Sequence, residues 1–300
     1  MAALIDTAAD PVIDPRGVNS GVAPVTYGHG ERPPRGDYEQ ARADYTCEQD
    51  WGAYSAADHE LYRRLYERQA AQLSGLACEE FIDAVGQLGS PAQIPRFDAL
   101  SEKLQRATRW EVVAVPGLIP EEAFFSLLSQ RRFPVTDWIR KPEEFDYVVE
   151  PDVFHDLFGH VPLLFNPMFA DYMQAYGAGG LKASRLESCE YLARLYWYKV
   201  EFGLIDTPAG LRAYGAGILS SAGELRHSVT SREPQRLGFD LERIMRTRYK
   251  IDSYQPTYFV IDSFAQLFDA TAQDFTPIYQ RVAQQPELAA DEAAPGDRPA

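Results

Sequence analysis

The stretch Pro151-Asp-Val-Phe-His-Asp-Leu-Phe-Gly-His-Val-Pro162 places two histidines, His155 and His160, five residues apart in an otherwise apolar run. Farther along the chain, the carboxylate of Glu201 stands in a second apolar stretch, Tyr196-Trp-Tyr-Lys-Val-Glu-Phe-Gly-Leu204. A carboxylate is costly to bury unless a positive charge compensates it. A divalent metal ion bound by all three side chains would account for them together.

The spacing of the two histidines does not suit a regular helix. On an ideal α-helix, residues five apart lie roughly 140° apart around the axis, so both imidazoles would not face one ion. We therefore predict that His155 lies in a first turn, or that a wider π-type turn, a distortion common at functional sites, separates the histidines. Gly159, directly before His160, permits such a distortion.

A purely structural interpretation of these residues competes with the metal site. The histidines could be hydrogen-bonded core residues, with Asp152 and Asp156 forming salt bridges beside them. Glu201 weighs against this interpretation, because three costly polar groups would then be buried without an ion. Two imidazoles and one carboxylate suit both Zn(II) hydrolysis and Fe(II) oxygen chemistry, and the ligand count alone does not choose between them.

Composition narrows the class of protein. The chain has 300 residues, of which 45% are hydrophobic and 24% charged, enough for a substantial core. A net charge of −15 argues against a nucleic-acid or anionic-membrane partner. Three widely spaced cysteines, Cys47, Cys78 and Cys189, argue against a disulfide framework and fit the cytoplasm. We find no secretory signal and no apolar run of about 18 residues, and expect a soluble cytoplasmic protein.

Breakers and periodicity divide the chain into three parts. Residues 1–36 are rich in Gly and Pro and 285–300 lack an apolar period, so we expect both ends to be disordered. Residues 37–284 form one expected catalytic domain, mainly α with a few short β-strands. Expected helices begin at a capping box at Ser55-Ala-Ala-Asp58, hold residues 81–88 and 97–104, and begin near Pro120. We also expect strands at 111–115 and 257–261, a buried helix over 191–204, and a late helix capped by Asp262.

Three sequence blocks, in this order, resemble the aromatic amino acid hydroxylase family. They are the stretch from Pro151 to Pro162, the stretch from Tyr196 to Leu204, and Ala213-Tyr-Gly-Ala-Gly-Ile-Leu-Ser-Ser221. The resemblance covers about residues 40–283 and is closest to short bacterial members that act on phenylalanine. It implies a single helical catalytic domain that uses Fe(II), a tetrahydropterin and O2 to convert L-phenylalanine to L-tyrosine. It also implies a monomer, with pterin-carbinolamine dehydratase as a functional partner.

The resemblance assigns roles to individual residues. His155, His160 and Glu201 match the family's iron ligands, and Arg140 matches the arginine that holds the amino-acid carboxylate, a task suited to a guanidinium. The other matches are the substrate-pocket residues Trp197, Phe202 and Ser220, the pterin-site residues Gly117, Leu118, Phe124 and Asp156, and the supporting residues Tyr196 and Glu224. From composition alone, Arg140 would be an ordinary surface arginine and the aromatic residues would be packing residues.

Three alternatives to phenylalanine hydroxylation stay open at the level of sequence. The nearest is the same chemistry on L-tryptophan or L-tyrosine, because pocket size, which the motifs do not give, decides among the three amino acids. A zinc hydrolase would use the same ligand set without O2. A non-catalytic, metal-stabilised helical scaffold would show metal-dependent stability without oxidation of a pterin.

Overall fold

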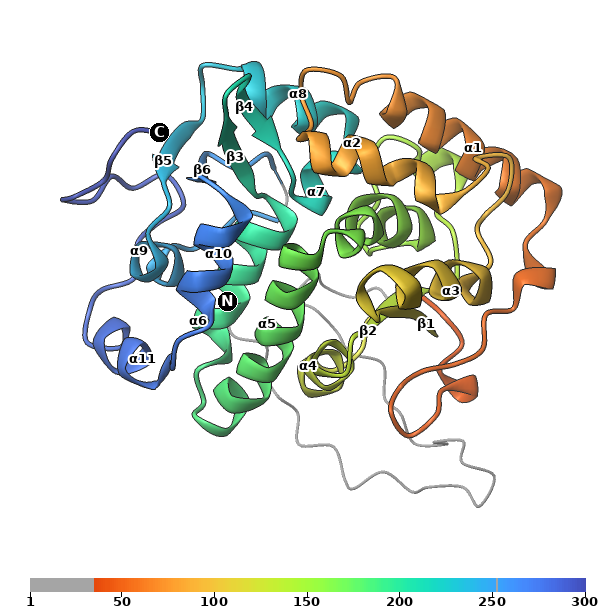
Figure 1. Cartoon of the computed structure of the whole chain (residues 1–300), viewed down its shortest axis with the longest axis horizontal. Helices are drawn as coiled ribbons and strands as arrows, with labels where there is room; N and C mark the ends of the chain where they lie inside the picture. Colours follow the sequence, from red (N-terminus) through yellow and green to blue (C-terminus); the bar gives the residue numbers. More distant parts are fainter. Residues whose placement is uncertain (1–34, 252) are drawn as a thin grey trace.

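The computed structural model describes residues 35–251 and 253–300, so the disorder expected for 1–36 lies outside the described residues except at its last two positions. Helices dominate and the strands are short (Figure 1). The expected mainly α architecture is therefore confirmed. In the described part of the chain, no helix is long and apolar enough to cross a membrane.

The first helices follow the sequence pattern closely. Helix α1 (Ala56–Ala70) begins at a capping box, in which Ser55 Oγ accepts the N–H of Asp58 and the Asp58 carboxylate accepts the N–H of Ser55. Helix α2 (Glu79–Val85) runs into a 3-10 turn that ends at Gly89, where φ is +95°. Helix α3 (Phe97–Thr108) buries its apolar stripe.

The strands form two small sheets. Strands β1 (Glu111–Val115) and β2 (Arg132–Thr136) pair in parallel and are connected through α4 (Glu121–Ser129). The second sheet has the order β4-β3-β6-β5, with β6 (Thr257–Ile261) parallel to both of its neighbours. Every residue of β6 is buried, as expected of a central strand with an unbroken apolar run. The other strands of this sheet are β3 (Leu204–Thr207), β4 (Gly210–Ala213) and β5 (Gln235–Gly238).

A long helix, α5 (Pro167–Arg185), runs through the middle of the molecule and packs against α4 and α10 (Phe264–Thr271) (Figure 1). A Cβ atom at Gly180 would lie 2.2 Å from the Phe125 ring, so this close approach of α4 and α5 requires glycine. The remaining helices are α6 (Cys189–Tyr196), α7 (Ala216–Leu219), α8 (Ala222–Thr230), α9 (Leu241–Arg246) and α11 (Thr276–Val282).

Two expected elements differ from the structure. The helix expected over 191–204 ends as α6 at Tyr196 and continues as a π-helical turn, and Leu204 already begins β3. The cap of α10 is Ser263 and not Asp262, because Ser263 Oγ accepts the N–H of Gln266 at 3.1 Å. The Asp262 carboxylate instead accepts the side-chain amide of Gln266.

The C-terminal residues 285–300 also differ from the expected disordered tail. The backbone N–H of Leu288 donates to the carbonyl of Arg246 at 2.9 Å, and the side chain of Leu288 is buried. Arg243, itself buried, pairs with Asp297 at 2.8 Å. The hydrophobic pattern of the sequence could not predict these contacts, because ion pairs and backbone hydrogen bonds attach the segment to the rest of the protein.

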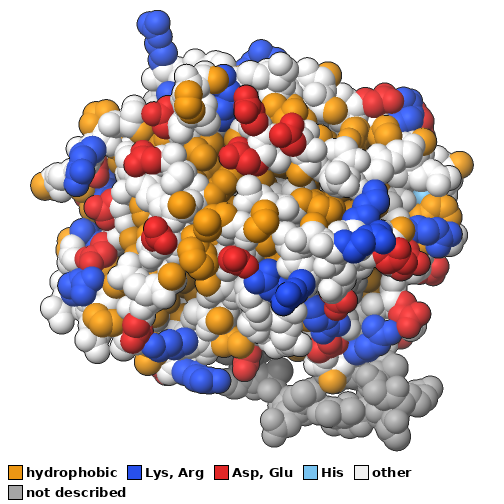
Figure 2. Space-filling model, in the orientation of Figure 1, with side chains coloured by type: hydrophobic (Ala, Val, Ile, Leu, Met, Phe, Trp, Pro, Cys, Tyr) orange, Lys and Arg blue, Asp and Glu red, His pale blue; other side chains and the backbone are white. Residues whose placement is uncertain are grey.

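Charged side chains of both signs are interspersed on the face seen in Figure 2, with apolar side chains visible between them. The net charge of −15 is therefore not gathered into one acidic region on this face.

Candidate metal centre

The two histidines of the opening motif lie on a π-helix that spans His155–His160. A π-helix closes hydrogen bonds from residue i to i+5, so side chains five residues apart fall near each other. The expected departure from α-helical geometry is thus present where the metal hypothesis required it. Gly159 allows the start of α7 to approach this π-helix closely, since a Cβ atom there would lie 2.8 Å from the carbonyl oxygen of Ala216.

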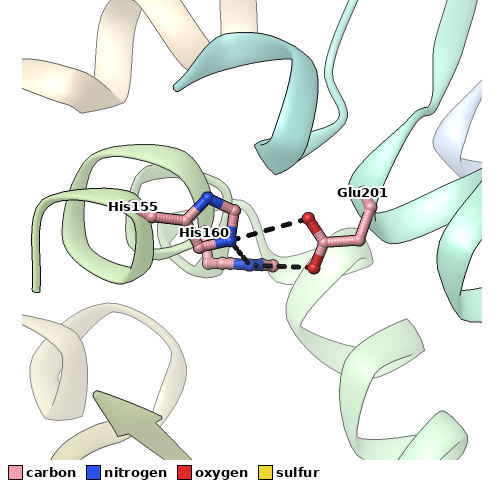
Figure 3. Close-up of side chains that lie close together, drawn as sticks. All are labelled: His155, His160 and Glu201. Atoms are coloured by element: carbon pink, nitrogen blue, oxygen red, sulfur yellow. Dashed lines mark hydrogen bonds and ion pairs between the residues drawn. The ribbon is translucent and has the colours of Figure 1, made fainter. Parts of the chain in front are cut away.

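The third residue of the expected triad arrives from a second π-helix, Trp197–Glu201, which extends α6. Its carboxylate faces both imidazoles (Figure 3). Glu201 Oε1 lies 3.2 Å from His160 Nε2, Glu201 Oε2 lies 3.6 Å from His155 Nε2, and the two Nε2 atoms lie 3.2 Å apart. Two donor atoms each ~2.1 Å from one ion, at right angles, lie ~3.0 Å apart. The three side chains therefore fit ligation of one divalent ion on one side.

The electrostatics of the triad favour a cation. Burial alone would raise the pKa of Glu201, but the nearby imidazoles lower it, so the carboxylate is ionised. Burial lowers the pKa of His155 to about 4, so its imidazole is neutral. Burial would lower the pKa of His160 as well, but the Glu201 carboxylate raises it. A metal ion would take the place of the proton that the Glu201 carboxylate favours on His160, since ligands bind in their deprotonated forms.

Surrounding groups orient the ligands. Ser220 Oγ lies 2.9 Å from His155 Nδ1, which directs the other ring nitrogen, Nε2, toward the triad. Gly217 packs closely against the carboxylate of Glu201, since a Cβ atom at Gly217 would lie 3.1 Å from Glu201 Oε2. Ser220, expected near the amino-acid end of the substrate, is thus a direct partner of a metal ligand.

Arg140 is not a surface arginine. It is 4% exposed, and its Nε and Nη2 donate to the two carboxylate oxygens of Asp152 at 2.8 and 2.9 Å. Asp152, which is fully buried, also accepts the backbone N–H of His155 at 3.0 Å. One carboxylate therefore links the expected substrate anchor to the start of the histidine π-helix, and the Nη1/Nη2 edge of Arg140 is the one that a ligand carboxylate could meet.

Aromatic side chains of the ligand-bearing segments belong to two groups of ring contacts. The rings of Trp197 and Phe202 lie 5.0 Å apart, and Trp197 stacks on Tyr249 with ring centroids 4.2 Å apart. In the second group, the Tyr196 ring is stacked with the His160 ring, with centroids 6.4 Å apart, and meets the Phe124 ring edge-on at 5.5 Å. The aromatic residues expected for the substrate and the pterin therefore belong to separate clusters beside the metal centre.

The loop expected to hold the pterin is fixed from the N-terminal side. Tyr38 Oη donates to the carbonyl of Leu118 at 2.9 Å. A Cβ atom at Gly117 would lie 2.7 Å from the carbonyl oxygen of Arg35, so this approach of two backbones requires glycine. Asp156 lies on the histidine π-helix, and its carboxylate accepts the N–H of Thr136 at 2.8 Å. Burial raises the pKa of Asp156 to about 7.

Glu224 does not contact the triad. Its carboxylate accepts the N–H of Gln255 at 3.1 Å and the hydroxyl of Tyr258. Burial raises the pKa of Glu224 to about 7. These contacts hold Glu224 against Gln255 and Tyr258, and its supporting role at the site stays a prediction.

Sequence reasoning did not assign roles to three residues that contact the ligands or the segments next to them. Asp152 appeared only as a salt-bridge partner in the structural alternative, and Gly217 only as part of the block from Ala213 to Ser221. Gln69, whose side-chain amide donates to the carbonyl of Leu219 at 2.7 Å, did not appear at all. A hint for Asp152 was available, because an aspartate at the start of a helical turn that carries a ligand is well placed to accept backbone N–H groups. The other two contacts join distant parts of the chain and leave no local pattern.

The model of the biopterin-dependent aromatic amino acid hydroxylase family matches residues 32–284. This chain belongs to that family. It is 58% identical over 262 residues to phenylalanine-4-hydroxylase of Ralstonia nicotianae, a match that covers 87% of this chain and 84% of the relative. It is 53% identical over 258 residues to the protein of the same name in Caulobacter vibrioides, covering 86% and 88%.

Solved structures of this hydroxylase family agree with the fold. The phenylalanine hydroxylase of Chromobacterium violaceum with bound oxidised Fe(III) is 56% identical, with a TM-score of 0.84, covering 86% of this chain and 94% of that one. The expected family and helical catalytic fold are thereby confirmed. His155, His160 and Glu201 are the iron site of this aromatic amino acid hydroxylase.

Proposed function

We propose that this enzyme hydroxylates L-phenylalanine to L-tyrosine with O2, using Fe(II) and a tetrahydropterin such as tetrahydrobiopterin as co-substrate. The observation that carries the proposal is the convergence of two imidazoles and one carboxylate, from two π-helices, in a chain 58% identical to a phenylalanine-4-hydroxylase. When bound, Fe(II) and the tetrahydropterin supply the redox chemistry that activates O2. The residues of this chain supply the positions at which these groups and the amino acid meet.

The protein's task in this reaction is positioning. His155, His160 and Glu201 would hold the ion with three protein ligands, a set that leaves coordination positions for small ligands. Arg140, oriented by Asp152, offers a guanidinium edge to the carboxylate of the amino acid, so that its ring is directed toward the metal. Trp197 and Phe202 provide apolar surface for that ring. Phe124 and the loop at Gly117 and Leu118 provide the surface for the pterin ring.

A panel of L-phenylalanine, L-tryptophan and L-tyrosine, with Fe(II), tetrahydropterin and air, tests the choice of substrate. We expect tyrosine to form from phenylalanine with the highest kcat/KM of the three. Preference for tryptophan or tyrosine would overturn the substrate while leaving the family intact. Oxygen uptake together with metal analysis distinguishes this chemistry from hydrolysis at zinc, which membership of the hydroxylase family does not support.

We further propose that the enzyme works in the cytoplasm as a monomer, with pterin-carbinolamine dehydratase recycling the oxidised pterin. The three cysteines, which are free thiols in the structure, support a reducing compartment. Light scattering coupled to size exclusion tests the monomer.

A further inference from the structure

Helix α7 contacts both ligand-bearing segments of the metal centre. Its Gly217 lies against the carboxylate of Glu201, since a Cβ atom at Gly217 would lie 3.1 Å from Glu201 Oε2. Ser220, which follows α7, places its hydroxyl 2.9 Å from His155 Nδ1. A displacement of α7 would therefore disturb the orientation of two of the three ligands.

Helix α7 is too short to hold itself in place. It has four residues, fewer than a helix needs for stability on its own. The carbonyl of Ile218 accepts the N–H of Ser221 at 3.1 Å, which leaves the carbonyl of Leu219 as the last one of the helix. The carbonyl of Leu219, directly before Ser220, accepts a hydrogen bond of 2.7 Å from Gln69 Nε2. Gln69 belongs to α1, about 150 residues earlier in the chain.

The glutamine at this position has a specific physical consequence. Gln69 has no exposed surface and stands on the buried face of α1 with Leu61, Tyr62 and Leu65. Burying an amide is unfavourable unless it is hydrogen-bonded, and an apolar residue would pack on this face without that cost. The amide is useful here because it satisfies a carbonyl that α7 leaves unpaired.

We infer that Gln69 is a positioning residue of the metal centre, acting through Leu219 and Ser220 on the imidazole of His155. The inference depends on the iron triad and not on which amino acid is hydroxylated. Replacing a hydrogen-bond partner of a metal ligand commonly lowers metal affinity about tenfold to a hundredfold. Gln69 is one contact farther away, so we expect an effect near the lower end of that range.

Binding of Co(II) to the metal-free protein, followed by visible absorption, tests the inference without any turnover. Gln69→Met removes the donor and keeps the size of the side chain, and should weaken Co(II) binding about tenfold. Gln49→Met is the matched control, since Gln49 Nε2 also donates to a backbone carbonyl, that of Pro95, on elements that carry none of the site residues. This control should bind Co(II) with the affinity of the unmodified protein.

A double-mutant cycle separates positioning from a general loss of stability. If Gln69 acts through Ser220, then Gln69→Met should weaken Co(II) binding by less than about threefold once Ser220→Ala is already present. Unchanged affinity in Gln69→Met, or the same loss with and without Ser220→Ala, would overturn the inference. Should Gln69→Met not fold by circular dichroism, Gln69→Asn, whose amide is one methylene shorter, takes its place under the same criteria.

Discussion

Replacing Asp152 by asparagine removes the charge that holds Arg140, with almost no change in shape. The native carboxylate accepts four donors: Nε, Nη2 and the backbone N–H of Arg140, at 2.8 to 2.9 Å, and the backbone N–H of His155 at 3.0 Å. An asparagine side chain keeps one acceptor oxygen and turns a pair of N–H donors toward the others. The guanidinium of Arg140, which is 4% exposed, would then be neither paired with a negative charge nor solvated by water.

The expected loss of stability is large. Removing one partner of a buried ion pair costs about 3–5 kcal/mol, because the remaining charge stays buried. Burial alone would raise the pKa of Asp152, but the hydrogen bonds and charge of Arg140 lower it below 3.8. A lowered pKa contributes stability above pH ~3.8 that disappears as the pH falls toward the folded-state pKa. The difference between the native protein and Asp152→Asn should therefore be full at pH 7 and shrink in acid.

Urea denaturation of the metal-free proteins at pH 7, followed by circular dichroism, measures this loss. Asp171→Asn is the control, because Asp171 pairs with Arg131 at the surface, with 49% of its side chain exposed. An exposed pair contributes less than about 1 kcal/mol, so this control should unfold almost as the native protein does. If Asp152→Asn loses no more stability than Asp171→Asn, the buried ion pair does not organise this part of the site.

Three further predictions concern the other parts of the site. Arg140→Ala should raise the KM for phenylalanine tenfold or more, because it removes a charge-assisted hydrogen bond worth about 1.5–3 kcal/mol. An unchanged KM with a lower kcat would refute the role of Arg140 in binding the substrate carboxylate. Glu224, whose pKa burial raises from 4.5 to about 7, should make the native protein less stable as pH rises from 4.5 to 7, by at most ~3 kcal/mol. Glu224→Gln should flatten this decline in thermal denaturation, and an unaltered profile would contradict it. Gly117→Ala should raise the KM for the pterin without lowering metal content, because the added Cβ would clash with the carbonyl of Arg35 and displace the loop. An unchanged KM would show that this loop does not bind the pterin.

Much of the fold could be predicted because residues close together in the sequence determine these elements. The capping box at Ser55, the apolar stripe of α3 and the unbroken apolar strand β6 depend on neighbouring residues only. The cap of α10 was misplaced by one residue because Asp262 and Ser263 are both good capping residues, and only the backbone geometry chooses between them.

The ligands of the metal could be predicted because burial makes them costly, and the five-residue spacing of His155 and His160 even required a π-type turn. The residues that position these ligands could not be predicted. In the sequence, Gln69 cannot be distinguished from the other polar residues of an amphipathic helix. Its partner is the backbone carbonyl of Leu219, and a backbone carbonyl has no sequence signature. The contacts of residues 285–300 escaped for a related reason, since Arg243 and Asp297 pair across the fold without any periodicity.

Metal titration of the triad variants tests the central claim most directly. The native protein should bind one Fe(II) or Co(II) ion per chain under anaerobic conditions, and His155→Ala, His160→Ala and Glu201→Ala should each lose stoichiometric binding. Circular dichroism should show that each variant is folded before its metal binding is compared with that of the native protein. Binding of one ion with native affinity by any of the three folded variants would contradict the account.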